Sequence, residues 1–326
     1  MSIARTTFAL FALALLSASV VADDEPYRVK DLKITILSTM MTQVGVGEWG
    51  FSALVEADGH RILFDTGQRP DTVLLNAKSL SIDLSNVEEV VLSHNHGDHT
   101  GGLVRLRREL AADNERAMRI AHVSPPIFWE RPGWGPEWAM APKKAAFEAE
   151  GGVFIEHEDA AEIHPGIWLT GRVPRHHPEK NYGYWVGDEH RVGEVRSPDG
   201  LLADDVPESM SMVINTEKGL VVISGCGHAG LVNTLEHAAN VTGTEGIHAA
   251  IGGFHLLHAN DAHLDWTAKK LVNLGVENLV GAHCTGLEPV YRLRELADLD
   301  RSTAVVGATG AFFTLAEGIE ALTLAH

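Results

Sequence analysis

The chain has 326 residues, of which 45% are hydrophobic, and its formal net charge is −18 at pH 7. This acidity argues against nucleic acid as a partner, because lysine and arginine side chains that neutralise phosphates drive such binding. The chain is long for one domain, but no linker rich in serine, proline or glycine divides it, so we expect a single α/β domain over residues 23–326.

The first 22 residues have the pattern of a secretory signal peptide. Arg5 precedes an apolar run from Phe8 to Leu16, and small residues lead to Ala22. The run is shorter than the ~20 apolar residues that a membrane-spanning helix needs, so we predict cleavage after Ala22 and no membrane span. The exported chain loses one arginine and no acid, and is expected in the periplasm or outside the cell.

Apolar residues with the periods of strands and helices alternate along the rest of the chain. Strands are expected at residues 34–38, 51–56, 62–64, 87–93, 212–215, 220–224, 249–252, 278–281 and 304–306. Helices are expected at residues 71–80, 102–112, 231–239, 262–274 and 289–297, with a further helical pattern from Thr100 and with Asp261 as the cap of the fourth.

The run His-Asn-His-Gly-Asp-His at residues 94–99 carries the clearest chemistry. Imidazole and carboxylate groups are ligands that Zn²⁺ prefers. His94 and His96 are two residues apart after a strand and can point the same way, whereas the adjacent Asp98 and His99 must diverge at a helix start. One loop could thus serve two metals. The alternative is a solvated polar loop, which this spacing disfavours.

Two glycine patterns resemble a dinucleotide-binding fingerprint. The pattern at residues 45–50 precedes a strand, not a helix, and the pattern at residues 225–230 has no acidic residue at the end of the next expected strand. The sequence therefore predicts no nucleotide cofactor.

The histidine run after a strand resembles the signature of the metallo-β-lactamase-fold superfamily, which is mostly hydrolytic. The resemblance extends to the branch linked to dihydropterin ribofuranosylaminobenzene phosphate synthases, and it implies a four-layer αββα sandwich. The other segments that carry it are Trp49-Gly50-Phe51-Ser52, Leu63-Phe64-Asp65-Thr66-Gly67, Ile223-Ser224-Gly225-Cys226-Gly227-His228-Ala229-Gly230, Gly252-Gly253-Phe254-His255-Leu256 and His283-Cys284-Thr285-Gly286.

The resemblance also implies a ligand set. One metal is expected on His94, His96 and His228, and a second on Asp98, His99 and His283. Many superfamily members place a bridging aspartate where this chain has Cys226, and a thiolate there favours softer metals. His176 and His177 are rivals for the role of His228, although their loop, with two arginines and Lys180, is equally consistent with an anion-binding lip or with plain exposed histidines.

Three further features lie near this set. Asp98 and His255 are the candidate catalytic residues, and Asp65 is expected to orient a ligand histidine. Cys226 and Cys284 are compatible with a metal ligand, free thiols or a disulfide. The tryptophan- and proline-rich segment 124–144 is either a lid with an apolar wall for the substrate or a loop packed on its own tryptophans.

We expect a secreted hydrolase in which a hydroxide held by a binuclear zinc site attacks an ester, lactone, amide or phosphoester of a small molecule. Iron or manganese could replace zinc. The alternatives are a synthase-type transferase of the resembled branch and an iron-binding redox protein of the same fold. The sequence does not indicate the oligomeric state.

Overall fold

The computed structural model describes residues 26–323 except 136–137 and 187–188. The segment predicted to be a signal peptide lies outside these residues. Among the described residues, no helix is both long and apolar enough to cross a membrane.

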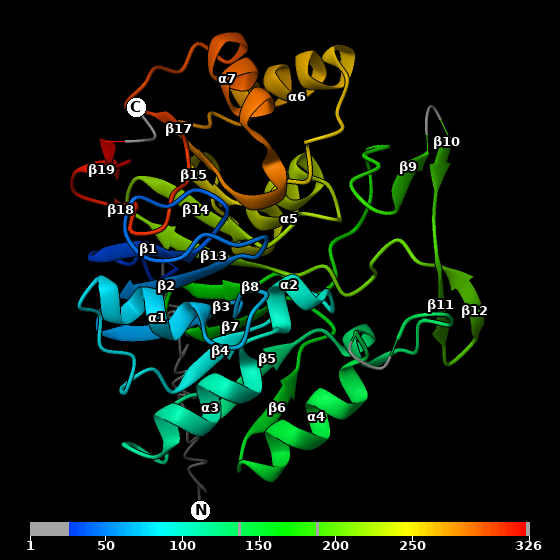
Figure 1. Ribbon diagram of the computed structural model, residues 1–326. Helices are drawn as coiled ribbons and strands as arrows, with labels where there is room; N and C mark the ends of the chain where they lie inside the picture. Colours follow the sequence, from blue (N-terminus) through cyan, green and yellow to red (C-terminus); the bar gives the residue numbers. More distant parts are fainter. Residues whose placement is uncertain (1–25, 136–137, 187–188, 324–326) are drawn as a thin grey trace, which may run out of the picture.

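Two mixed sheets stack face to face and form the centre of the fold (Figure 1). The first sheet has the strand order β19 (Gly318–Glu320), β18 (Phe312–Thr314), β1 (Leu32–Ser38), β2 (Ser52–Ala57), β3 (His60–Phe64), β4 (Glu89–Val91), β5 (Ile120–Val123) and β6 (Val153–Glu156). The second has the order β17 (Ala304–Val306), β16 (Asn278–Gly281), β15 (Ile247–Gly252), β14 (Gly219–Ser224), β13 (Ser211–Thr216), β8 (Ile167–Leu169) and β7 (Ala161–His164).

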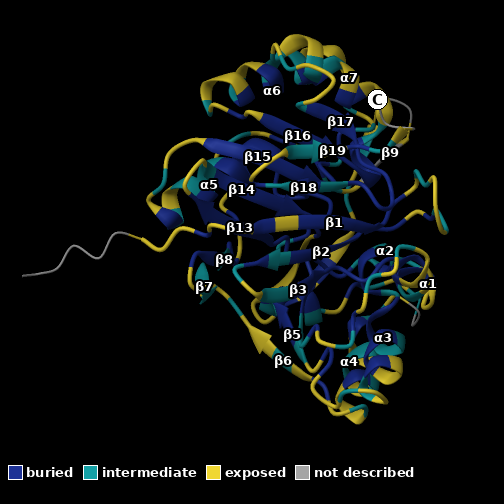
Figure 2. Ribbon diagram, turned by 90° about the vertical axis from the view of Figure 1, so that its left-hand side faces the viewer, coloured by how far each residue is buried: buried dark blue, intermediate teal, exposed yellow. Residues whose placement is uncertain are grey.

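Helices cover both outer faces, so the fold has the predicted four αββα layers (Figure 2). The first sheet is covered by α1 (Thr72–Ser79), α3 (Leu103–Ala111) and α4 (Met140–Ala149), and the second by α5 (Leu231–Thr242), α6 (Asp261–Asn273) and α7 (Leu287–Leu296). Short helical turns are α2 (Gly97–Thr100), η1 (Pro125–Phe128) and η2 (His283–Thr285), and two hairpins are formed by β9 (Tyr184–Val186) with β10 (Glu189–Arg191) and by β11 (Glu194–Ser197) with β12 (Gly200–Ala203).

The central strands, such as β13 to β16, are apolar on both faces, as expected where a sheet is covered on both sides. In β14, Val221 and Ile223 pack into the core between the sheets, whereas Leu220 and Val222 pack under the helices. This two-residue alternation fixes the register, since a shift by one residue would exchange the two faces.

A polar cluster joins the two sheets at one edge. His164 of β7 in the second sheet contacts Glu89 of β4 in the first at 3.0 Å and stacks on His60 of β3 with ring centroids 4.0 Å apart. Glu89 also accepts a hydrogen bond from Nε2 of His122 on β5 at 3.1 Å, and Nδ1 of His122 accepts one from Nε2 of His157 at 2.9 Å.

Several element boundaries differ from those expected. The strand expected at 87–93 is only Glu89–Val91, and the expected helix after it begins at Gly97 because the carbonyl of His96 accepts from the amides of His99 and Thr100. Helix α6 is capped by Asn260, not by Asp261: the Asn260 side chain accepts from the amide of His263. Part of the proline-rich segment 124–144 is helical, in η1 and at the start of α4.

Candidate metal centre

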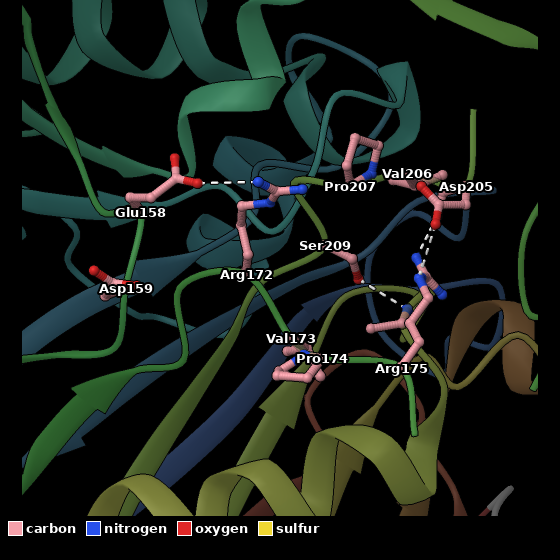
Figure 3. A pocket seen from close by; sticks show the side chains of 11 residues that line it. Glu158, Asp159, Arg172, Val173, Pro174, Arg175, Asp205, Val206, Pro207 and Ser209 are labelled. Carbon is pink, nitrogen blue, oxygen red and sulfur yellow. Dashed lines mark hydrogen bonds and ion pairs between the residues drawn. The ribbon is translucent and has the colours of Figure 1, made fainter. Parts of the chain in front are cut away.

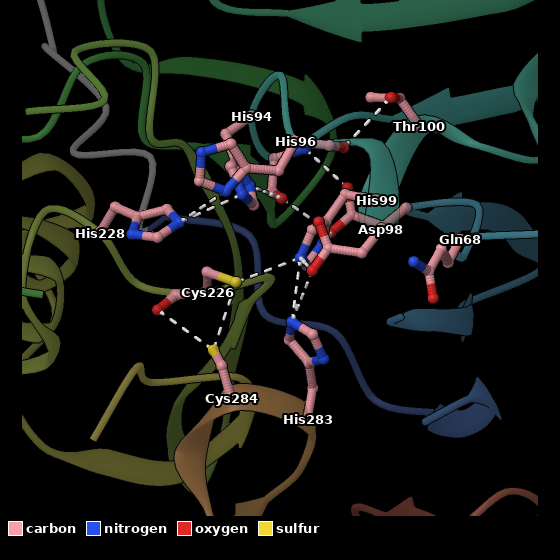
Figure 4. A network of polar contacts seen from close by, with 12 residues as sticks. Gln68, His94, His96, Asp98, His99, Thr100, Cys226, His228, His283 and Cys284 are labelled. Atoms are coloured by element: carbon pink, nitrogen blue, oxygen red, sulfur yellow. Dashed lines mark hydrogen bonds and ion pairs between the residues drawn. The ribbon is translucent and has the colours of Figure 1, made fainter. Parts of the chain in front are cut away.

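The candidate ligands all lie in loops at the carboxyl ends of strands. Strands β14, β15 and β16 are mutually parallel, and β3 is parallel to β4, so the loops within each set leave the same edge of a sheet. The first sheet contributes Asp65 and residues 94–99, and the second contributes Cys226, His228, His255 and His283. The predicted site residues, far apart in sequence, thereby meet at one edge (Figure 4).

The first group consists of His94, His96 and His228, whose ligand atoms lie within 4.8 Å of one another. Nε2 of His228 is 3.2 Å from Nε2 of His94 and 3.3 Å from Nδ1 of His96. The other ring nitrogen of His228 donates to the carbonyl of Asn181, which can only accept. Nε2 of His228 therefore presents a lone pair to the group.

The second group consists of Asp98, His99, Cys226 and His283. Nε2 of His99 is 3.1 Å from Sγ of Cys226 and 3.3 Å from Nε2 of His283, and Oδ2 of Asp98 is 3.3 Å from the same His283 nitrogen. Asp98 and His99 were expected to diverge, but both side chains enter this one group, with Nε2 of His99 3.7 Å from Oδ2 of Asp98. Cys226 occupies this group together with two histidines and a carboxylate.

Asp65 contacts the second group directly and the first through Ser93, in the orienting position predicted for it. Its Oδ2 accepts from Nδ1 of His99 at 2.7 Å and from the hydroxyl of Ser93 at 2.7 Å. Because the Ser93 proton is committed to Asp65, the Ser93 oxygen accepts from Nδ1 of His94 at 2.8 Å. One buried carboxylate thereby fixes the tautomer of one histidine in each group.

These tautomers show that the donor set fits divalent cations. Nε2 of His94 and Nε2 of His228 both present lone pairs and face each other, a repulsive arrangement that a cation between them relieves. The first group offers three imidazoles, and the second offers two imidazoles, a carboxylate and a thiol. These are the kinds of ligand that zinc takes in proteins.

Electrostatics favour the same conclusion. Burial, with the neighbouring histidines, lowers the pKa of His94 and His228 well below its usual value and that of His96 to about 4, so these rings are neutral as ligation requires. In the second group, burial disfavours the charged form of His283. The neighbouring Cys284 and Asp98 outweigh this effect and raise the pKa of His283 to about 10. His283 must therefore release its proton when a metal binds, and the negative groups around it favour a cation in the place of that proton.

A family model of the metallo-beta-lactamase superfamily matches residues 50–283. The chain belongs to the metallo-β-lactamase superfamily. It is 31% identical over 274 residues to the 7,8-dihydropterin-6-methyl-4-(beta-D-ribofuranosyl)-aminobenzene-5'-phosphate synthase of Methanocaldococcus jannaschii, covering 80% of this chain and 90% of the relative.

Two solved structures support the fold. A crystal structure described as a metal-dependent hydrolase of the β-lactamase superfamily matches with TM-score 0.64 and 29% identity, over 81% of this chain and 92% of that one. The metallo-β-lactamase fold protein YhfI of Bacillus subtilis matches with TM-score 0.52 and 12% identity, over 87% and 100% of the two chains, and this likeness concerns the fold alone.

In this metallo-β-lactamase superfamily member, a cavity of about 420 Å³ opens beside both groups. His96 and Asp98 form its floor, and Trp134 and Trp138 of the segment 124–144 form a wall with two glycines. The Trp134 ring lies 5.6 Å from the His96 ring, and Trp138 packs so closely on Gly97 that a Cβ there would come within 2.4 Å of the indole. The segment thus provides the apolar wall that was one of its two predicted roles.

A buried ion cluster holds this wall in place, and the sequence does not reveal it. The Arg131 side chain, 1% exposed, pairs with Glu208 at 2.8 Å and with Asp204 at 2.7 Å. Its guanidinium lies 5.3 Å from the Trp134 ring centre, and Glu208 also accepts from the amide of Asn95 in the histidine run. Neither Arg131 nor Glu208 belongs to a recognisable motif, so only the tertiary contacts identify them.

The rivals of His228 lie elsewhere. His177 pairs with Glu236 at 2.8 Å, and neither it nor His176 enters a ligand group of the described residues. Their loop borders a separate cavity of about 430 Å³ (Figure 3). The two arginines there are paired: Arg172 contacts Glu158 at 3.0 Å, and Arg175 contacts Asp205 at 3.1 Å and donates to the carbonyl of His228. This pairing occupies both arginines, so an anion-binding lip stays a prediction that rests on the exposed Lys180.

His255 and the cysteines complete the site. His255 lies beside His228, with ring centroids 4.8 Å apart, and forms a third possible group with Cys226 and His228. Its Nδ1 has no hydrogen-bond partner among the described residues.

Cys226 and Cys284 are free thiols and not a disulfide. Asp65, His255 and His283 all have positive φ angles of 46–56°, backbone strain of the kind that gathers at functional sites.

Proposed function

We propose that this protein is a metal-dependent hydrolase of uncharged esters, lactones or amides that carry an aromatic or apolar group. The observation that carries the proposal is the cavity in which two tryptophans stand directly over His96 and Asp98. Such a wall can bury the apolar surface of a substrate and leave the scissile bond of the substrate over the ligand groups.

His94, His96 and His228 would hold one divalent ion, and Asp98, His99, Cys226 and His283 the other. Bound there, zinc ions supply water of lowered pKa and polarise a carbonyl oxygen. Asp98 faces the cavity and lies in the second group, so it can accept the proton of the attacking water. His255, whose Nδ1 is unpartnered among the described residues, is the candidate proton donor to the leaving group.

No lysine or arginine is found among the described residues that line the cavity, which supports an uncharged substrate. The described residues that line the cavity are His96, Asp98, two glycines and two tryptophans. Nearby, Arg131 is committed to two carboxylates and Lys143 donates to Thr100 at 2.8 Å. A phosphate is normally recognised by available lysine, arginine or backbone donors, so phosphoesters fit this wall less well.

A synthase-type transferase is the second candidate, favoured by the 31% identity to a relative whose name specifies a phosphate-bearing product. The lining of the cavity argues against a phosphate-bearing substrate for this chain. The pattern of residues 1–22 supports placing the hydrolase outside the cytoplasm. Iron-dependent redox chemistry has no comparable support.

The test is to measure metal content and hydrolysis in protein purified without a histidine tag. We expect about two zinc ions per chain, turnover of aryl or long-chain acyl esters and lactones, and loss of turnover after chelation. His96→Ala should retain about one zinc and lose turnover, whereas His258→Ala, at an exposed position outside the ligand groups, should change neither. A folded protein without metal would overturn the proposal, and turnover only with phosphate-bearing donors would favour the transferase.

A further inference from the structure

The two cysteines of the chain lie against each other at the candidate metal centre. Cys226 follows β14 and Cys284 lies in η2 after β16, yet their Sγ atoms are 3.2 Å apart (Figure 4). Both are buried, with 3% and 1% of their surfaces exposed, and both are free thiols. A disulfide needs an S–S distance of about 2.05 Å, so a small approach of two loops would suffice to form it.

The Cys226 sulfur has two competing partners. On one side it is 3.1 Å from Nε2 of His99 and belongs to the group with Asp98 and His283. On the other side is Cys284, which belongs to none of the ligand groups of the described residues. A sulfur bonded to Cys284 no longer carries the negative charge of a thiolate ligand. Ligation by Cys226 and a bond to Cys284 are therefore mutually exclusive.

We propose that Cys226 and Cys284 form a reversible disulfide that withdraws Cys226 from the metal centre and makes metal binding sensitive to oxidants. The disulfide itself does not depend on the hydrolase function proposed above; only its effect on turnover does. A redox role also explains why Cys284 stands beside a ligand position without joining the ligand group.

The reaction balances with a peroxide as the oxidant. One thiolate attacks the O–O bond of hydrogen peroxide, which gives a sulfenic acid and, after protonation, water. The second thiol then attacks that sulfur, which forms the S–S bond and releases a second water. Two thiols lose two protons and two electrons in total, and one peroxide is reduced to two waters. A dithiol reductant reverses the reaction.

The first test uses the metal-free full-length protein and a small excess of hydrogen peroxide. After alkylation of remaining thiols, we expect mass spectrometry to show loss of two hydrogens, no alkylated cysteine and one peptide pair that links Cys226 to Cys284. Dithiothreitol should restore two alkylated thiols. Two free thiols after oxidation, or sulfinic acids without a linked peptide, would overturn the proposal even if the protein is an active hydrolase.

The second test measures the consequence by zinc titration against a chromogenic chelator. Oxidation should weaken binding of one zinc by about tenfold or more and leave the other intact. Cys284→Ser, which keeps Cys226 but cannot form the disulfide, should bind zinc like the unmodified chain before peroxide, and should still do so after it in those molecules whose mass shows no oxygen added to Cys226. Circular dichroism verifies that each protein is folded, and Cys284→Ala serves if the serine variant is not. A linked disulfide with unchanged zinc affinity would overturn the switch.

Discussion

At the scale of single residues, Asp65 determines the chemistry of both ligand groups. It accepts directly from His99 and, through the Ser93 hydroxyl, sets the tautomer of His94. It also accepts from the Ser93 amide at 2.7 Å, so the end of β4 is held in place by the same carboxylate.

Asp65→Asn should weaken zinc binding by about 10- to 100-fold. The asparagine NH2 group would face His99 or Ser93, which both donate hydrogen bonds to Asp65. Competition with a chromogenic chelator measures this, and both zinc ions should be affected. Asp71→Asn is the matched control, since Asp71 is exposed and pairs only with Arg105 at the surface. Affinity equal to that of the unmodified chain would refute the orienting role.

At the scale of elements, the site depends on how closely strand-end loops approach one another. A Cβ on Gly225 would come within 2.1 Å of the Ser93 hydroxyl and 2.5 Å of Oδ2 of Asp65. Glycine is therefore the residue that lets the loop after β14 in one sheet pack against the loop after β4 in the other.

Gly225→Ala should displace Ser93 and Asp65, lower the free energy of unfolding by about 2 kcal/mol and reduce zinc content. Urea unfolding and plasma mass spectrometry measure the two effects. Gly193→Ala is a suitable control, because its Cβ would meet only the Asp204 Cβ at 4.0 Å. If both variants behave alike, the close approach at Gly225 is unimportant.

The sequence predicts the central elements well because their periodicity is strong, as in β14, β15 and β16. It misses β5 to β12, β18 and β19, which are strands of three or four residues. Strands β6 and β12 are also largely exposed, so their burial leaves little pattern in the sequence. The ligand residues could be predicted because they lie in motifs at strand ends. Arg131, Glu208 and Asn181 could not, since their contacts arise only when distant loops meet.

At the scale of the whole molecule, the two sheets are joined by the shared core and, at one edge, by the cluster around Glu89. Burial, with His122, lowers the pKa of His157 to about 4, and burial lowers that of His60 as well. In the unfolded chain these histidines titrate near pH 6.5. The unfolded state therefore binds more protons between pH 6.5 and 4, and stability falls as the pH is lowered through that window.

His157→Gln should reduce the stability lost between pH 7 and pH 5 by about 1 kcal/mol, after allowance for partial exposure. The glutamine amide can still donate to Nδ1 of His122, so the structure should be kept. Urea unfolding of the metal-free protein at both pH values gives the difference. The exposed His258→Gln is the control, and an unchanged pH dependence in His157→Gln would contradict the assignment.

The two sheets contribute equally to the site, since His94, His96, Asp98 and His99 precede residue 161 and Cys226, His228, His255 and His283 follow it. Neither ligand group is complete within one of these parts. A chain emerging from the ribosome thus lacks part of the first group until His228 has been made and part of the second until η2 has been made, and β18 and β19 must then still return to the first sheet. The complete candidate centre therefore assembles late in biosynthesis, and unfinished chains do not hold it.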